Sequence, residues 1–406
     1  MTRLWMSALL VLISIMCFSQ PVKDSSKTTT KPTAEKKWFE TVSVRGYVQI
    51  RYNRLLETNP DLGNEQGDRS WGKNGGFFMR RARIIFFGQI SKQVYFYFQP
   101  DFASSASSTS LHFGQIRDAY IDLGVDVKNE FRFRIGQSKI PYGFENMQSS
   151  QNRLPLDRND ALNSAVANER DMGVFFYWAP TKQRELFSSL VRDGLKGSGD
   201  YGVFALGAYN GQTANRPEQN DRLHVVTRLT YPMAVGNQII EPSIQAYTGK
   251  YVVTRDQTNI GTKVKQDRNY LDQRLAGTFV LYPKPFGILA EYTIGKGPEF
   301  NPATDSIETR SLHGGYVTLS YMMKNKQQQI FIPFIRGQYY NGGKKHEQDA
   351  RRHRVKELEI GIEWQPVKQF ELVAMYTISS RRYEDFALQN NLQKGSLLRL
   401  QAQLNF

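Results

Sequence analysis

The sequence predicts an all-β protein, a transmembrane antiparallel β-barrel of about 16 strands with an inward-folded long third loop. From residue 40 to the C-terminus, segments of about ten to twelve residues alternate apolar and polar side chains, which is the period of a strand with two unlike faces. The connections between them alternate between long and short, as in outer-membrane barrels. A soluble β-sandwich would have shorter strands and no reason for such alternation.

Other protein classes are excluded by composition. No stretch after residue 19 approaches the roughly 18–20 apolar residues that a membrane-spanning helix needs. The one cysteine, Cys17, lies in the N-terminal apolar segment, so the mature chain has no cysteine for a disulfide or a metal site. The net charge of +15 is of the kind found in proteins that bind nucleic acid. An exported protein rarely meets nucleic acid, so no nucleic-acid partner is expected, and anionic solutes or lipopolysaccharide phosphates are better candidates.

The N-terminus predicts export. Residues 1–19 combine Arg3, an apolar stretch and Ser19, the arrangement of a secretory signal peptide. Residues 20–39 are largely polar, contain proline and lysine and lack periodicity, so they predict a flexible periplasmic tether. The barrel is then expected to span 40–406, in the outer membrane of a Gram-negative bacterium.

The first and last segments show the alternation most clearly. In 41–52 one face carries Val44 and Ile50, and the other carries Arg45 and Arg51. Strands are predicted near 41–53, 77–90, 93–103, 111–124, 130–140, 172–180, 200–210, 221–231, 239–250, 270–282, 286–295, 309–322, 329–340, 351–364, 368–379 and 394–406. The segment 181–199 is long where a short turn is expected, and no sequence feature explains it.

The cost of burying charge in lipid predicts which face points outward. If the polar face met the bilayer, arginines such as Arg51 and Arg399 would each cost about 2–4 kcal/mol near the midplane. The apolar face is therefore expected to meet lipid, and the polar face is expected to line a wet lumen.

The predicted lumen is rich in arginine. Its guanidinium presents a rigid fork of donors that suits phosphate or carboxylate better than chloride. The alternative is that these arginines pair with neighbouring acids and only keep the wall hydrated. The candidate pore-lining and anion-binding residues are Arg45, Arg51, Arg81, Arg83, Arg132, Arg134, Arg222 and Arg228.

The longest ordered-looking connection is 141–171, and it contains Arg153, Arg158 and Arg170. A loop of this length is usually functional. We expect it to fold into the barrel as a constriction loop, because apolar residues such as Leu154 and Leu162 favour packing. The alternative is an exposed loop.

Several motifs together resemble the phosphate-selective porin O and P family. They are the run 136–145 (GQSKIPYGFE), 79–83 (MRRAR), 115–122 (QIRDAYID), 169–173 (ERDMG), 208–211 (AYNG), 333–336 (PFIR) and the terminal 404–406 (LNF). The resemblance implies a trimeric barrel with an inward third loop and an arginine ladder, which would fall on Arg81, Arg83, Arg132 and Arg134. Because 141–171 lacks the lysine found in phosphate-specific members, general or weakly anion-preferring diffusion is expected.

An enzyme is not expected, because the five histidines show no metal-ligand spacing and no nucleophile or phosphate-loop motif occurs. No cofactor or metal is predicted. The expected function is an outer-membrane porin that passes small hydrophilic solutes, with a preference for anions or phosphate as a further step. The alternative is a plugged barrel acting as a surface adhesin or structural anchor. Expected partners are these solutes, outer-membrane lipid and lipopolysaccharide, and two further copies in a homotrimer.

Overall fold

The computed structural model describes residues 37–56, 76–103, 113–167 and 170–406. The predicted signal peptide at 1–19 and nearly all of the predicted tether at 20–39 lie outside the described residues. The described chain begins with a short 3-10 helix, η1 (Trp38–Thr41), whose Trp38 and Phe39 side chains are exposed.

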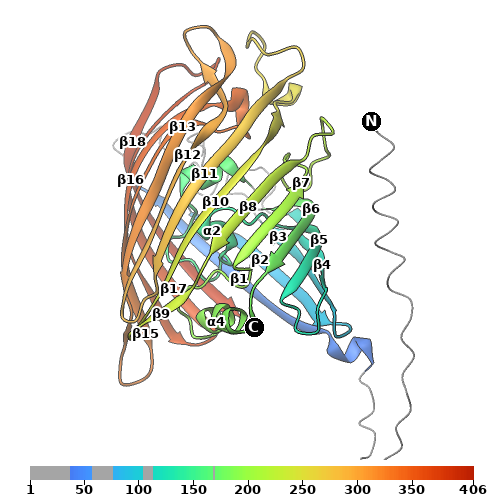
Figure 1. Cartoon of the computed structure of the whole chain (residues 1–406). Coiled ribbons are helices and arrows are strands. Elements are labelled where there is room, and N and C mark those ends of the chain that lie inside the picture. The colour runs from blue at the N-terminus through green and yellow to red at the C-terminus, as the bar shows by residue number, and fades with distance from the viewer. Residues whose placement is uncertain (1–36, 57–75, 104–112, 168–169) are drawn as a thin grey trace, which may run out of the picture. The chain divides into compact units, whose positions relative to one another are not determined.

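Strands dominate the described residues and form one antiparallel sheet (Figure 1). They are β1 (Ser43–Leu55), β2 (Gly76–Gln89), β3 (Val94–Ala103), β4 (Phe113–Gly124), β5 (Phe131–Lys139), β6 (Arg170–Trp178), β7 (Phe204–Tyr209), β8 (His224–Thr230), β9 (Met233–Val235), β10 (Gln238–Val252), β11 (Asn269–Leu281), β12 (Phe286–Asn301), β13 (Ser306–Tyr321), β14 (Met323–Lys324), β15 (Ile330–Gly343), β16 (Arg352–Val367), β17 (Phe370–Glu384) and β18 (Asn391–Asn405). The helices are α2 (Phe144–Met147), α3 (Asp160–Ala165), α4 (Thr181–Arg192), η3 (Arg255–Gln257) and η4 (Gln348–Ala350).

These strands make a closed barrel. β8 and β9 both pair with β10, and β13 and β14 both pair with β15, so the 18 described strands make a wall of sixteen. The sheet closes where β1 pairs with β18 as well as with β2. At that seam the Gly46 and Phe406 backbones exchange hydrogen bonds of 2.7 and 3.0 Å. The predicted barrel is confirmed, and closure leaves no strand edge unpaired in lipid.

The seam also explains a glycine. A Cβ placed on Gly46 would lie 2.6 Å from the Phe406 ring and 2.4 Å from the Arg83 carbonyl oxygen. A side chain at this position would therefore force β1 away from the neighbours that close the barrel.

The predicted orientation of the faces is confirmed. Ile50 and Leu404 are about half exposed on the outer surface, whereas Arg51 and Arg399 on the opposite face are almost completely buried. Arg45 also faces inward but is exposed at the end of β1, and its guanidinium lies 4.8 Å from the centre of the Phe87 ring. Within the described ranges no helix has the length and apolarity needed to span a membrane.

The two ends of the barrel differ. The C-terminus, η1 and the tight turns such as the one between β2 and β3 lie at one end, at the bottom of Figure 1. In outer-membrane barrels the short turns are periplasmic and the long loops extracellular. We therefore call the end of the barrel that holds the C-terminus periplasmic.

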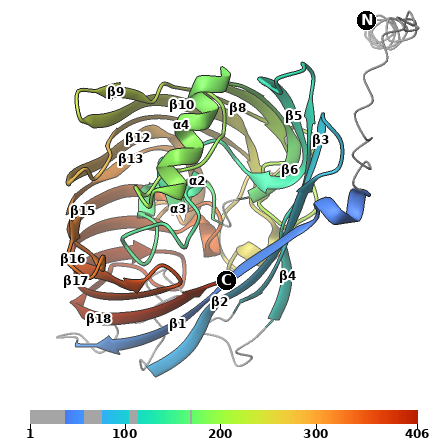
Figure 2. The same cartoon turned by 90° about the horizontal axis from the view of Figure 1, so that it is seen from below.

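Two segments differ from simple connections. The segment between β5 and β6 contains α2 and α3, which lie within the ring of strands when the barrel is seen from below (Figure 2). The unexplained insertion at 181–199 is mainly the helix α4, followed by buried residues such as Leu195 at the periplasmic end. Because this insertion continues to residue 203, β7 begins later than the strand predicted at 200–210.

Candidate functional site: the arginine-lined wall

Two β-bulges place extra arginines on the inner wall. The register of β1 and β2 shifts so that Gln49 lies opposite Arg81 and Ile50 opposite Met79, which leaves Arg80 as the extra residue. The register of β3 and β4 shifts in the same way, because Gln99 lies opposite Asp118 and Pro100 opposite Ile116, leaving Arg117. A bulge inserts one residue and redirects its side chain. Arg80 and Arg117 consequently reach carboxylates that also bind inward-facing arginines.

These bulges assemble an arginine cluster, which we define as Arg80, Arg81, Arg83, Arg117 and Arg153. Arg83 and Arg117 share Asp101, with N···O distances of 2.9 and 3.8 Å. Arg80 lies 3.8 Å from Asp157. In the part of the chain that the structure describes, these ion pairs involve two carboxylates, Asp101 and Asp157, for the five guanidinium groups of the cluster.

Arg81 is the least compensated member of the cluster. Its Nη1 donates a 2.7 Å hydrogen bond to Gln49 Oε1, and within the described ranges its buried Nε has no hydrogen-bond partner. Its strongest electrostatic neighbours are the like charges of Arg80, Arg83 and Arg153. No carboxylate among the described residues lies within ion-pair distance of Arg81. A buried cation in such surroundings favours an oxyanion.

Most other predicted arginines are paired with acids. For these the alternative interpretation, a hydrated and neutralised wall, fits the contacts. The pairs are Arg51–Asp157 at 3.0 Å, Arg132–Asp200 at 2.8 Å, Arg134–Asp122 at 2.7 Å, Arg170–Asp118 at 2.9 Å and Arg228–Glu241 at 2.8 Å.

Two predicted residues occupy other places than expected, and a third, Arg158, lies in the predicted loop but has structural contacts within it. Arg222 precedes β8 and is exposed in the connection, because the strand begins at His224 rather than near 221. Arg170 is the first residue of β6 and belongs to the wall, not to the preceding loop. Arg158 lies in that loop, but its guanidinium donates to the Val166 and Ala167 carbonyl oxygens, so it holds the loop together.

The segment 140–167 contacts inward-facing side chains of distant strands. Asp157 accepts hydrogen bonds from Arg51 of β1 and Arg399 of β18. Glu145 lies 2.8 Å from Arg336 of β15. Asp160 forms ion pairs with Arg381 of β17 and with Lys344. These contacts attach the segment to the wall, and Ser150 accepts a 3.1 Å hydrogen bond from Arg83 within the arginine cluster.

The charge state of these attachment points predicts a pH dependence. Burial alone would raise the pKa of Asp157, but Arg51 and Arg399 outweigh it and hold the pKa well below its usual range. Arg381 and Lys344 likewise outweigh burial and lower the pKa of Asp160. A carboxylate whose pKa is lowered by folding stabilises the folded state at pH values above its unfolded-state pKa of about 3.9. This stabilisation is lost only as the pH falls through the folded-state pKa.

We therefore expect the single-channel conductance to stay constant between pH 7 and pH 4.5, as measured in planar bilayers at fixed salt. An increase in conductance that begins above pH 5 would contradict the lowered pKa values of these two carboxylates, because both should still be charged at that pH.

Strict alternation along the strands does not predict Arg80 and Arg117 as residues of the inner wall. A signal was present, because Arg80–Arg81 and Arg117–Asp118 are adjacent charged residues within strands. With strict alternation, one residue of each pair would face lipid, and exposing its charge near the midplane would cost about 2–4 kcal/mol. A bulge avoids that cost.

No metal site is found in the part of the chain that the structure describes, since it contains no group of three or more histidine, cysteine or acidic side chains able to hold an ion.

Comparison with known proteins identifies the fold and a family. The model of the family described as "Phosphate-selective porin O and P" matches residues 56–406. A search of curated proteins gives no match.

Solved structures with the same fold are outer-membrane proteins. The outer membrane channel DcaP of Acinetobacter baumannii is 16% identical, with a TM-score of 0.54 and coverage of 90% of this chain and 97% of that chain. OmpF of Salmonella typhi, in complex with daunomycin, is 12% identical, with a TM-score of 0.57 and the same coverages. The anion-selective porin from Comamonas acidovorans is 8% identical, with a TM-score of 0.51 and coverages of 90% and 99%.

Proposed function

Because the chain belongs to the phosphate-selective porin O and P family, and is therefore an outer-membrane porin, we propose that it favours small anions during passive diffusion. The family and the fold indicate a channel rather than an enzyme. The selective element in this proposal is the arginine cluster, and the observation that carries it is the uncompensated charge of Arg81. Arginine binds oxyanions in a fixed, often bidentate geometry, so phosphate and carboxylate solutes are the preferred class.

The segment 140–167 is the constriction in this proposal. Its hydrogen bonds and ion pairs reach β1, β15, β17 and β18, and it contributes Arg153 and Ser150 beside the arginine cluster. A solute passing along the wall at this level would meet the cluster and the segment together, because Ser150 of the segment accepts a hydrogen bond from Arg83 of the cluster. The segment therefore sets both the width and the charge of the path.

Conductance in planar lipid bilayers tests the proposal. We expect purified protein to give discrete ion-conducting steps, a reversal potential in a salt gradient that indicates preference for anions, and a chloride current that added phosphate reduces. Absence of steps would contradict the channel, and a cation-selective reversal potential would contradict the anion preference alone.

A plugged barrel acting as an adhesin or anchor is the second candidate, because the segment 140–167 fills part of the interior. It predicts a correctly inserted protein without conductance. The same bilayer recordings therefore separate the two functions.

We also propose that the porin is a homotrimer. The outward side chains of β3 to β7 are uncharged and largely aromatic or aliphatic, including Phe98, Ile121, Phe133 and Val174. Depletion of charge is typical of the core of an interface between subunits. Chemical cross-linking in detergent should give three linked copies.

A further inference from the structure

The lipid-facing surface of β11 to β18 carries a continuous row of outward residues. Successive strand pairings place Gly277 opposite Tyr292, Tyr292 opposite Gly315, and Gly315 opposite Tyr339. The row continues through Lys356, Ser380 and Lys394. Gly315 thus separates the two tyrosines, and Gly277 lies on the other side of Tyr292. Two lysines complete the row near the extracellular ends of β16 and β18.

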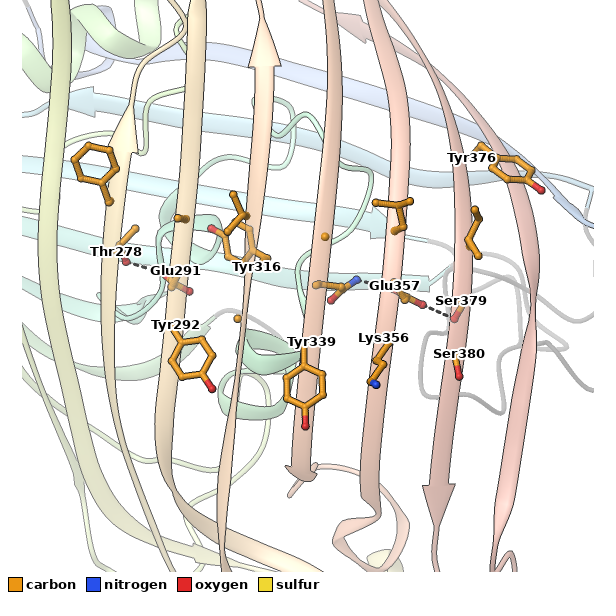
Figure 3. Close-up of a pocket in the computed structure, with 18 of the residues that line it drawn as sticks. Thr278, Glu291, Tyr292, Tyr316, Tyr339, Lys356, Glu357, Tyr376, Ser379 and Ser380 are labelled. Carbon is orange, nitrogen blue, oxygen red and sulfur yellow. Dashed lines mark hydrogen bonds between the residues drawn. The ribbon is translucent and has the colours of Figure 1, made fainter.

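The glycines leave a groove between the larger side chains. Its volume is about 1290 Å³, and Tyr292, Tyr339 and Lys356 line it from neighbouring strands (Figure 3). A Cβ built on Gly277 or on Gly337 would meet no atom within 4 Å, so both positions open onto free space. The groove continues into the apolar row on its periplasmic side, which includes Phe279, Val317, Leu358 and Ile378. Buried residues that also border the groove, such as Glu291 and Glu357, alternate with these on the same strands and face inward.

Uncompensated positive charge lies at the extracellular side of this groove. Lys356 and Lys394 are exposed and have no ion-pair or hydrogen-bond partner within the described residues. The same holds for Arg354, which lies in the next outward row toward the extracellular end. Arg382 faces Arg354 across the β16–β17 pairing, and its charge is partly compensated by Glu384 at 3.8 Å. The three outward rows that make up this surface contain no aspartate or glutamate. We call the groove and these four basic residues the lipid groove.

We propose that the lipid groove binds lipid A, the phosphorylated and multiply acylated anchor of lipopolysaccharide in the outer leaflet. Lys356 and Lys394 contact its phosphates, and its acyl chains lie over Gly277, Gly315 and Gly337, beside the two tyrosines. The arrangement matches such a lipid because anionic groups sit at the membrane surface and chains extend toward the bilayer centre. Basic side chains beside an apolar surface are the usual means of recognising anionic lipid headgroups.

A subunit interface fits this surface less well. Interface cores are depleted of lysine and other charged residues, and an unpaired buried charge is costly. The uncharged outer face of β3 to β7 lacks this disadvantage. A partner subunit on the groove is nevertheless an outcome that the experiment below would reveal.

The test is native mass spectrometry of the purified porin in detergent with added lipid A, lipid A lacking phosphates, or inorganic phosphate. We expect the wild type to retain phosphorylated lipid A through detergent exchange. The double variant Lys356→Gln/Lys394→Gln should bind it more weakly by about fivefold for each lysine, since one basic side chain near an anionic lipid surface contributes about 1 kcal/mol. The control Lys92→Gln/Lys326→Gln removes the same charge at periplasmic turns and should leave binding unchanged.

A second variant tests the groove itself. A Cβ at Gly337 would meet no atom within 4 Å, so Gly337→Leu should place its side chain in the groove. It should exclude an acyl chain and weaken lipid A binding while bilayer conductance confirms an intact barrel. Equal binding of lipid A with and without phosphates, or equal binding by the lysine variant and its control, would overturn the proposal. Loss of oligomers in Gly337→Leu with lipid binding unchanged would also overturn it, because it would identify the groove as a subunit interface. Inorganic phosphate should not compete at concentrations that reduce the channel current, which distinguishes this site from the arginine cluster.

Discussion

Replacing Arg80 and Arg81 together by glutamine is expected to remove most of the anion preference of the channel. Arg80 lies 3.8 Å from the Asp157 carboxylate, and Arg81 has no ion-pair partner among the described residues. A unit charge about 4 Å away contributes about 1 kcal/mol even in bulk water, which is about fivefold in anion occupancy for each charge removed. The reversal potential in a salt gradient should therefore move toward that of a non-selective pore.

The double variant Arg134→Gln/Asp122→Asn is the matched control for this prediction. It also alters the inner wall, but it removes both partners of a 2.7 Å ion pair and leaves the net charge of the lumen unchanged. Its reversal potential should equal that of the wild type. Equal shifts in the two double variants would show that the uncompensated charge of the cluster does not determine selectivity.

Replacing Asp157 by alanine is expected to produce the largest change in conductance. Asp157 is the carboxylate that joins the segment 140–167 to Arg51 and Arg399, and both arginines are almost completely buried. Removing one partner of a buried ion pair costs about 3–5 kcal/mol, because the other charge remains without compensation. The segment should detach from this part of the wall, and single-channel conductance should rise while thermal stability falls.

Asp200→Ala provides the comparison for Asp157→Ala. Asp200 also joins two arginines, Arg132 at 2.8 Å and Arg184 at 2.9 Å, but it lies outside the segment 140–167. The Asp200→Ala substitution should lower thermal stability without the rise in conductance expected for Asp157→Ala. Unchanged conductance in Asp157→Ala would mean that the segment does not restrict the path.

Much of the fold could be predicted because lipid imposes a simple rule on every strand. Side chains alternate across a strand and charge is costly in hydrocarbon, so the pattern in Thr41–Tyr52 or Leu398–Phe406 already indicates which residues face outward. The same rule placed Arg51, Arg81 and Arg134 on the inner wall. It failed where alternation is interrupted, at the bulges that bring Arg80 and Arg117 inward.

The sequence by itself determined the barrel, the orientation of its faces and an arginine-rich lumen, because these depend on periodicity and on the cost of charge in lipid. Only the tertiary structure decided which arginines are neutralised. Arg134 and Asp122 are twelve residues apart in the chain, but Arg51 and Asp157 are 106 apart, and no local pattern encodes such a pairing. Compensation of charge depends on which strands and loops meet across the interior, and that is fixed only when the sheet closes and the segment 140–167 meets the wall.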